Sequence, residues 1–173
     1  EYRAATVISA CHPKITFLDQ IDREDLPGAF VRDIEHWRTR SGTVKINLAL
    51  SHMPAFLYDP NGEDPEIAGS SIMVSPTIRY LEKAFEEARA GAPSTAPFSD
   101  GVMPTVYDRT LAPEGKHTVS LFTQWVPESW SKERNQDELD AYAQRLYDRF
   151  DVVAPGFKDS ILHEQVIGPY EME

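Results

Sequence analysis

The sequence predicts an α+β domain in which a mixed or antiparallel sheet carries helices mainly on one face. Segments with helical and strand periodicity alternate along the 173 residues, and several neighbouring strand segments are joined by links too short for a parallel crossover. The length fits one domain of ordinary size. With 41% apolar and 26% charged residues, the composition is that of a globular protein and not of a disordered or fibrous one.

The first elements are two strands with a helix between them. Residues 6–10 are a β-branched run that ends near Pro13, which predicts a short strand. Residues 26–37 place their apolar side chains on one helical face, and Gly42 stops this helix. Residues 43–51 then alternate apolar and polar side chains, so they form the clearest half-buried strand in the chain.

A loop, a weaker strand and a second helix follow. The loop covers 59–65, where Pro, Gly, Asn and Asp are frequent, and 67–74 is predicted as a strand. Ser75 and Pro76 begin the helix, because serine can accept from an unpaired amide and proline loses no useful donor at the first helical position. The apolar stripe of this helix ends at Gly91.

The next region predicts a two-stranded antiparallel ribbon. Residues 92–101, rich in Pro, Ser and Ala, are an irregular connection. Segments 102–107 and 116–126 are the two strands, and 108–115 holds the turn between them.

The last helix is the most regular. Asn135 and Glu138 can form a capping box at its start, and Pro155 with Gly156 ends it. Residues 161–167 are a final short strand. The inner face of the helix consists of Leu139, Tyr142, Ala143, Leu146, Tyr147 and Phe150.

Charge and cysteine content exclude several classes of function. The formal net charge of −11 opposes nonspecific binding to nucleic acid or anionic lipid, and Lys and Arg form no cluster, so we expect no nucleic-acid partner. No apolar run approaches 18 residues, so no membrane span is expected. Cys11 is the only cysteine, which excludes an intrachain disulfide or thiolate zinc site.

Location and completeness follow from the same features. One cysteine and no leader predict a cytoplasmic protein, with the mitochondrial matrix as the alternative in a eukaryote. The sequence opens at Glu1, not Met, inside a strand-like segment. We therefore expect this chain to be a piece of a longer protein.

Familiar catalytic and cofactor motifs are missing. No GxGxxG, P-loop, GxSxG or HExxH occurs, and the five histidines are scattered, so we expect no metal site and assign no catalytic residue. His117 is a candidate general base, or a strand-end histidine without function. The pair His163 and Glu164 could polarise a substrate, but adjacent residues on a strand point to opposite faces. An acidic run at 135–140 fits either a Ca²⁺ site or a helix start that opposes the dipole.

One strand face carries the candidate site. Lys45, Asn47 and Ala49 share that face, and it either lines a cavity with small and hydrogen-bonding groups or is exposed to solvent. Gln124 and Trp125 on the later strand either extend this face or lie on the other side of the sheet. The substrate-facing candidates are therefore Lys45, Asn47, Gln124 and Trp125.

Four stretches in the same order resemble the phytoene-desaturase-like group of FAD-dependent oxidoreductases, in particular its branch of pyridine nucleotide-disulphide oxidoreductase domain-containing proteins. They are TVKINLALSHMPAF at 43–56, the helix around YLEKAF at 80–85, the turn and strand from 104 to 125 with TLAP and GKH, and the APGF and QVIGP elements near the end. The opening strand is similar to one that leaves the FAD domain in that group. It carries Ala10, Cys11 and His12 where Asn-Ala-Asp is usual, and Arg109 replaces a proline.

The resemblance implies a domain that grips the substrate while the flavin is held elsewhere. Residues 1–13 would be a flanking strand of the FAD domain, and 14–173 the substrate-binding domain, with a fold like that of phytoene desaturase and amine oxidase-type flavoenzymes. The cofactor would be FAD, whose glycine-rich binding motif is absent from this segment. The expected partners are the FAD-binding domain of the same polypeptide and a small apolar or amphipathic substrate.

Three functions compete at this point. The first is the substrate domain of a larger FAD-dependent oxidoreductase, which shapes the cavity that presents a substrate to the flavin. The segment alone is then not expected to turn over. The second is a noncatalytic protein-interaction module that uses the exposed sheet face. The third is an acid–base enzyme built on His117, which requires a carboxylate within hydrogen-bond reach of that ring.

Overall fold

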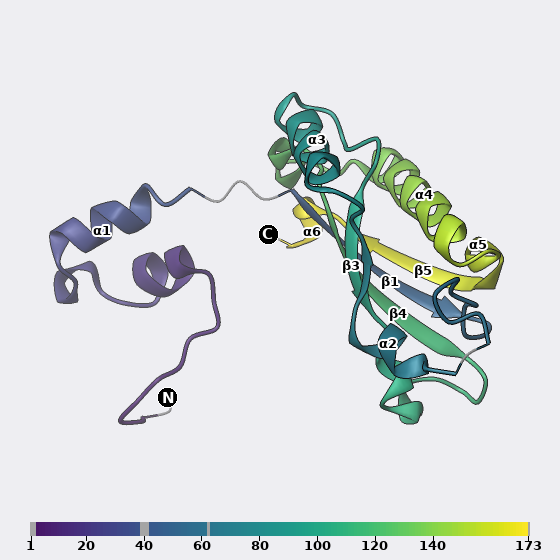
Figure 1. Ribbon diagram of the computed structural model, residues 1–173. Coiled ribbons are helices and arrows are strands. Elements are labelled where there is room, and N and C mark those ends of the chain that lie inside the picture. The colour runs from purple at the N-terminus through teal and green to yellow at the C-terminus, as the bar shows by residue number, and fades with distance from the viewer. Residues whose placement is uncertain (1–2, 39–41, 62, 173) are drawn as a thin grey trace. The chain divides into compact units, whose positions relative to one another are not determined.

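The computed structural model describes residues 3–38, 42–61 and 63–172, and it divides the chain into two compact units, Glu1–Arg40 and Ser41–Glu173. Figure 1 shows a small helical unit at the N-terminus and a larger unit with the sheet.

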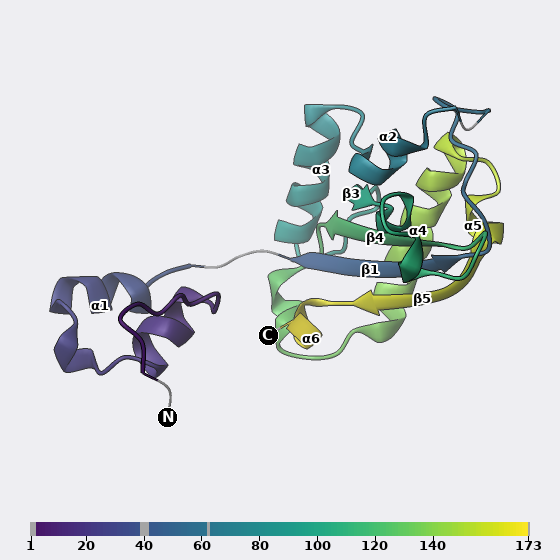
Figure 2. The same cartoon turned by 90° about the horizontal axis from the view of Figure 1, so that it is seen from below.

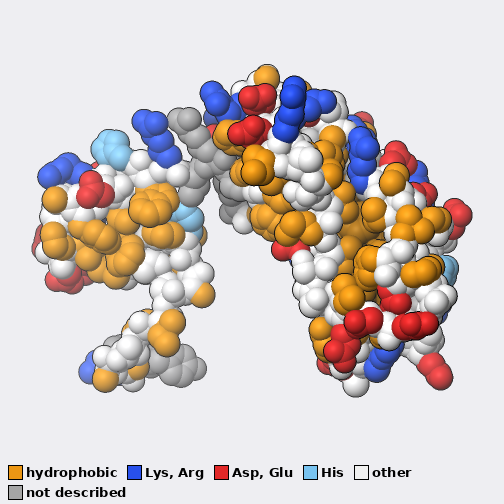
Figure 3. Space-filling view, viewed as in Figure 1, with side chains coloured by type: hydrophobic (Ala, Val, Ile, Leu, Met, Phe, Trp, Pro, Cys, Tyr) orange, Lys and Arg blue, Asp and Glu red, His pale blue; other side chains and the backbone are white. Residues whose placement is uncertain are grey.

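The N-terminal unit contains short helical segments and little buried surface. A π-helical turn at Ile15–Asp19, a 3-10 turn at Arg23–Asp25 and helix α1 (Gly28–Glu35) make up its regular structure. Phe17 and Phe30 meet edge to face, with ring centroids 4.9 Å apart. Figure 3 shows hydrophobic side chains gathered on one surface of this unit. Helix α1 matches the predicted apolar spacing but is shorter than expected.

The strand predicted at residues 6–10 is wrong. These residues form no strand, and Val7 and Ile8 are 83% and 92% exposed. A β-branched run becomes a strand only where another strand offers backbone partners, and no described strand pairs with this one.

The larger unit is built on a five-stranded antiparallel sheet with the order β2-β3-β4-β1-β5, which confirms the predicted α+β class. The strands are β1 (Thr43–Leu50), β2 (Ile72–Val74), β3 (Phe98–Val102), β4 (His117–Gln124) and β5 (Ile161–Ile167). The two longest strands, β1 and β4, lie side by side, and β5 pairs with the free edge of β1.

Alternation in β1 separates the two faces of the sheet, as predicted. Val44, Ile46, Leu48 and Leu50 are at most 3% exposed, while the residues between them are half-buried. Strand β4 adds Val119 and Leu121 to the same buried face. The apolar face of the sheet therefore forms one half of the core.

Helix α4 (Gln136–Val153) forms the other half of that core. All six residues predicted for its inner face are buried. In Figure 2, α4 crosses behind β4, β1 and β5. Thr123 donates to the Phe98 carbonyl oxygen at 2.7 Å, so the buried Tyr142 phenol is the donor in its own 2.8 Å bond to Thr123 Oγ1. This bond ties helix to sheet at a point where an unpaired hydroxyl would be costly.

The remaining helices are short and lie around the sheet. They are α2 (Pro65–Ser70), α3 (Ile78–Arg89), α5 (Phe157–Ser160) and α6 (Pro169–Met172). Helix α3 meets the end of β4 through an edge-to-face contact between Phe85 and Trp125, at a centroid distance of 5.1 Å.

Two predicted strands are misplaced. The first half of 67–74 is helix α2, begun by Pro65 at its first position, and only 72–74 pairs in the sheet. Residues 102–107 hold a 3-10 turn from Pro104 to Val106, because Pro104 has no amide hydrogen for a ladder. Besides β1, β4 pairs with β3, most of which lies in the segment 92–101 that was expected to be irregular.

Two predicted helix starts also differ. Thr77, not Ser75, caps α3, because its backbone is extended and its Oγ1 accepts from the Tyr80 amide at 3.1 Å. The capping box at α4 is wrong: the Asn135 side-chain amide donates to the Glu133 carbonyl oxygen at 2.8 Å.

Candidate functional site

The second face of the sheet lies opposite α4 and presents polar side chains; we call it the open face. Neighbouring strands bring residues of equal parity to this face, since directly paired residues in an antiparallel sheet point the same way. Asn47 pairs with Ser120 of β4 on one side and with Gln165 of β5 on the other. Three strands therefore present polar side chains in one row.

A chain of hydrogen bonds joins this row. The Lys45 ammonium donates to Ser120 Oγ at 2.5 Å, Ser120 Oγ donates to Asn47 Oδ1 at 3.1 Å, and Asn47 Nδ2 donates to Gln165 Oε1 at 3.1 Å. Lysine can only donate, so the serine hydroxyl proton points onward to the asparagine oxygen. That order fixes the orientation of the Asn47 amide and holds the row rigid.

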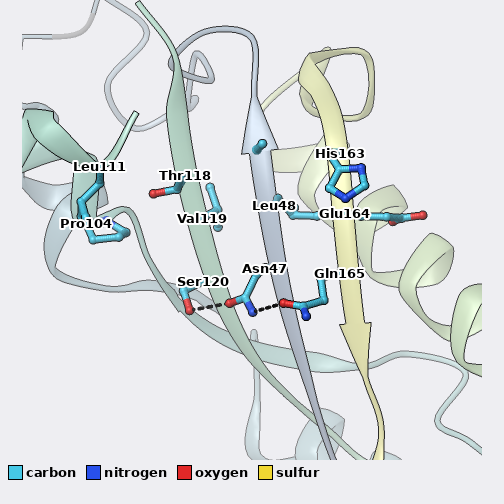
Figure 4. Close-up of a pocket in the computed structure, with 11 residues that line it drawn as sticks. Asn47, Leu48, Pro104, Leu111, Thr118, Val119, Ser120, His163, Glu164 and Gln165 are labelled. Atoms are coloured by element: carbon cyan, nitrogen blue, oxygen red, sulfur yellow. Dashed lines mark hydrogen bonds between the residues drawn. The ribbon is translucent and has the colours of Figure 1, made fainter. Parts of the chain in front are cut away.

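An open pocket of about 570 Å³ lies over this row. Figure 4 shows Asn47, Ser120 and Gln165 along one side of it and His163 on the same strand as Gln165. Pro104 and Leu111, from the two 3-10 turns before β4, supply an apolar wall opposite β5. The volume falls in the range typical of small-molecule sites, which combine apolar walls with a few fixed polar groups.

One cation, Lys45, lies beside the pocket and is hydrogen-bonded to the lining residue Ser120. Among the described residues, no carboxylate lies within 4.0 Å of the Lys45 ammonium. Glu164 contributes to the pocket's rim, but its carboxylate accepts from the Tyr147 hydroxyl at 2.5 Å on the α4 side of the sheet. Burial raises the pKa of Tyr147, and the hydrogen bond and charge of Glu164 act in the same direction.

The structure brings three of the four predicted substrate-facing residues to the open face. Lys45 and Asn47 belong to the hydrogen-bonded row. Gln124 has the same parity as Ser120 and donates to Thr43 Oγ1 at 2.9 Å, at the far end of β4 and away from the residues that line the pocket. Trp125 contacts Phe85 of α3.

His117 lies inside the protein, 5% exposed, with Nδ1 3.0 Å from Thr105 Oγ1. Burial lowers the pKa of His117, and the charges of Arg109 and His52 lower it further. Within the described ranges its ring bonds to a hydroxyl and not to a carboxylate, so the carboxylate required by the acid–base hypothesis is missing.

His163 and Glu164 point to opposite faces, as expected for neighbours on a strand. The imidazole lines the open pocket, while the carboxylate contacts α4. They therefore do not act on one ligand as a pair.

The acidic run at 135–140 is explained by helix geometry. Asp140 accepts from the Gln136 side chain at 2.7 Å, and Asp137 and Glu138 lie in the first turn of α4, where negative charge is favourable. No group of three or more His, Cys, Asp or Glu residues that could hold a metal ion occurs in the described part of the chain. No helix in the same part is long and apolar enough to cross a membrane.

Sequence reasoning missed four lining residues that come from other segments: Ser120, Gln165, Pro104 and Leu111. It named His163 only as half of a pair with Glu164, not as part of this face. Ser120 meets Asn47 only through the pairing of β4 with β1, which depends on strand order. Residues 163–165 of β5 are all polar, so no alternation in that strand indicated which of them would face the pocket.

Known proteins resemble this chain over its whole length. It is 37% identical over 179 aligned positions to a mouse (Mus musculus) protein named pyridine nucleotide-disulfide oxidoreductase domain-containing protein 2, and 37% identical over 180 positions to the rat (Rattus norvegicus) protein of that name. The chain spans 31% of the length of these relatives. No family model matches it. The names support the branch that the four sequence stretches indicated.

Proposed function

We propose that this chain is the substrate-binding domain of a larger FAD-dependent oxidoreductase of the phytoene dehydrogenase-like kind. The observation that carries the proposal is the open-face pocket, with its rigid polar row and apolar wall. The similarity to proteins named for pyridine nucleotide-disulfide oxidoreductase chemistry supports a redox context.

The residues of the pocket do not fit FAD itself. A dinucleotide pyrophosphate is bound by a glycine-rich turn before a helix, and none of the described residues that line the pocket is a glycine. The proposal therefore assigns flavin binding to another part of the polypeptide. When bound there, the flavin supplies the redox chemistry, and this chain contributes shape, orientation and exclusion of water.

Each side of the pocket has a defined task in this proposal. The amides of Asn47 and Gln165 orient a polar group, because hydrogen bonds to Ser120 and to each other fix them. Pro104 and Leu111 hold an apolar part of the substrate. The small Ala49 side chain leaves room between them.

The test uses the full-length polypeptide and the probe octan-1-ol. We expect the protein to bind FAD and the probe to change the visible absorption spectrum of the flavin. Ala49→Trp should abolish this change because the indole fills the pocket, while the flavin content stays the same. The matched control is Ala141→Trp, on an exposed position of α4. A polypeptide that binds no flavin, or a probe response that survives Ala49→Trp, contradicts the proposal.

A protein-interaction module is the second candidate, and two exposed apolar residues favour it. Val102 and Phe122 are 38% and 43% exposed and share the open face with Ser120. Under this alternative, Phe122→Ala abolishes association with a protein partner and leaves the probe response of the flavin intact.

A further inference from the structure

We infer that the open-face pocket takes a substrate with a carboxylate head and an apolar tail. This inference rests on the proposed function and names the class of ligand for the same pocket. Three observations carry it: the direction of the hydrogen bonds along the polar row, the missing counter-charge of Lys45, and the apolar wall beside them.

The polar row ends in donors on both sides. Lys45 uses one ammonium hydrogen on Ser120, and the Asn47 amide uses one hydrogen on Gln165 Oε1. Gln165 accepts this hydrogen bond through Oε1, so its amide hydrogens point away from Asn47. The hydrogen-bonding groups that the row leaves unused are therefore mainly N–H donors. An anionic oxygen needs such donors.

The charge of Lys45 has no partner in the described part of the protein. The chain has 28 acidic and 17 basic residues, yet no carboxylate lies within 4.0 Å of this half-buried ammonium. Lys83, Lys158, Arg23 and Arg134 have such partners, but other described Lys and Arg residues have none either, so what distinguishes Lys45 is its place beside the pocket. A cation left unpaired beside a pocket favours a ligand that brings the negative charge.

Lys45 reaches the pocket through Ser120. It is not itself a lining residue, but its Nζ lies 2.5 Å from the hydroxyl oxygen of Ser120, which is one. Because Ser120 already donates its only proton to Asn47, a carboxylate beside it would accept from the Gln165 amide and from the ammonium hydrogens that Lys45 does not use on Ser120. This geometry places the head at the row and the tail toward Pro104 and Leu111, and it disfavours a cationic head.

Calorimetric titration of this chain, whose sheet unit has its own core, compares octanoate with octan-1-ol. We expect octanoate to bind more tightly.

Lys45→Met and Gln165→Glu should each weaken octanoate binding by about tenfold, the size expected for a hydrogen bond to a charged group. Lys45→Met should leave octan-1-ol unchanged because Lys45 does not line the pocket, whereas Gln165→Glu alters a lining residue and is judged on octanoate alone. Gln165 is exposed, so that variant is compatible with folding. Lys83→Met, on α3, is the matched control that should change neither ligand.

The outcomes separate the two proposals. If the two probes bind equally well and Lys45→Met has no effect, the carboxylate inference is wrong while the pocket of the proposed function stands. If neither probe binds, the inference and the small-molecule pocket both fail. Octanoate binding that survives Ala49→Trp would place the ligand elsewhere and overturn the inference.

Discussion

His117 begins β4 with its ring turned into the protein, against the hydroxyl of Thr105. Burial and the nearby charges of Arg109 and His52 favour the neutral ring, and in the described ranges its ring bonds to a hydroxyl and not to a carboxylate. Protonation of His117 therefore opposes folding.

The folded pKa of His117 lies below its ordinary value of 6.5. Below that pH the unfolded ring binds a proton more readily than the folded ring does, so the free energy of unfolding should fall as the pH drops below 6.5. His117→Gln should flatten this part of the profile. Urea unfolding from about pH 7.5 to about pH 5.5 measures it, within the range where histidine titrates. His163→Gln, at an exposed ring, is the control, and equal slopes in wild type and His117→Gln would contradict the assignment.

Gly101 is required because β3 approaches the core too closely for a side chain. A Cβ at this position would lie 2.5 Å from Leu121 Cδ2. Gly101→Ala should therefore lower the free energy of unfolding by about 1–3 kcal/mol, as overpacking does. In Gly28→Ala the new Cβ would lie 3.7 Å from Arg32, an ordinary contact, and little change is expected. Denaturant unfolding compares the two alanine variants. If Gly101→Ala lowers the free energy of unfolding as little as Gly28→Ala does, Leu121 can move aside and the prediction is wrong.

At the scale of the element, alternation was sufficient for β1 and helical spacing for α4, and both form where predicted. Strand β5 also forms where predicted, but without alternation, because its sequence ILHEQVI has apolar residues at both ends and three polar residues between them. Short elements behave differently. Strand β3 has the sequence FSDGV, in which Gly101 and Asp100 disfavour a strand, and it forms because β4 supplies its backbone partners.

The start of α3 is a second case in which the sequence alone does not decide the local structure. Ser75 and Thr77 both have the chemistry of a cap, and only the backbone conformation selects Thr77. Thr77→Ala should lower the free energy of unfolding by about 1 kcal/mol, because the Tyr80 amide loses its side-chain acceptor. Ser75→Ala should cost less than about 0.5 kcal/mol. Thermal or urea unfolding decides between them, and a larger loss at Ser75 would contradict the observed cap.

At the scale of the molecule, the candidate site exists only because strand order joins distant segments. Asn47 and Gln165 are 118 residues apart in the chain, and they meet because β5 pairs with β1. The sequence indicated Lys45 and Asn47 through alternation, but strand order is set by the packing of the whole sheet against α4. The expected boundary at residue 13 remains a prediction, while the compact units divide between 40 and 41.

The central proposal is that the open face forms a wall of an enclosed cavity in a larger protein that binds a flavin. A single cysteine in place of Ala49, in a Cys11→Ser background, tests it most directly through its reaction rate with a maleimide. In this chain Ala49→Cys should react readily, because the pocket is open. In the flavin-loaded full-length protein it should react much more slowly, while Ala141→Cys on α4 reacts equally in both. Equal rates for Ala49→Cys in the two proteins would contradict the account.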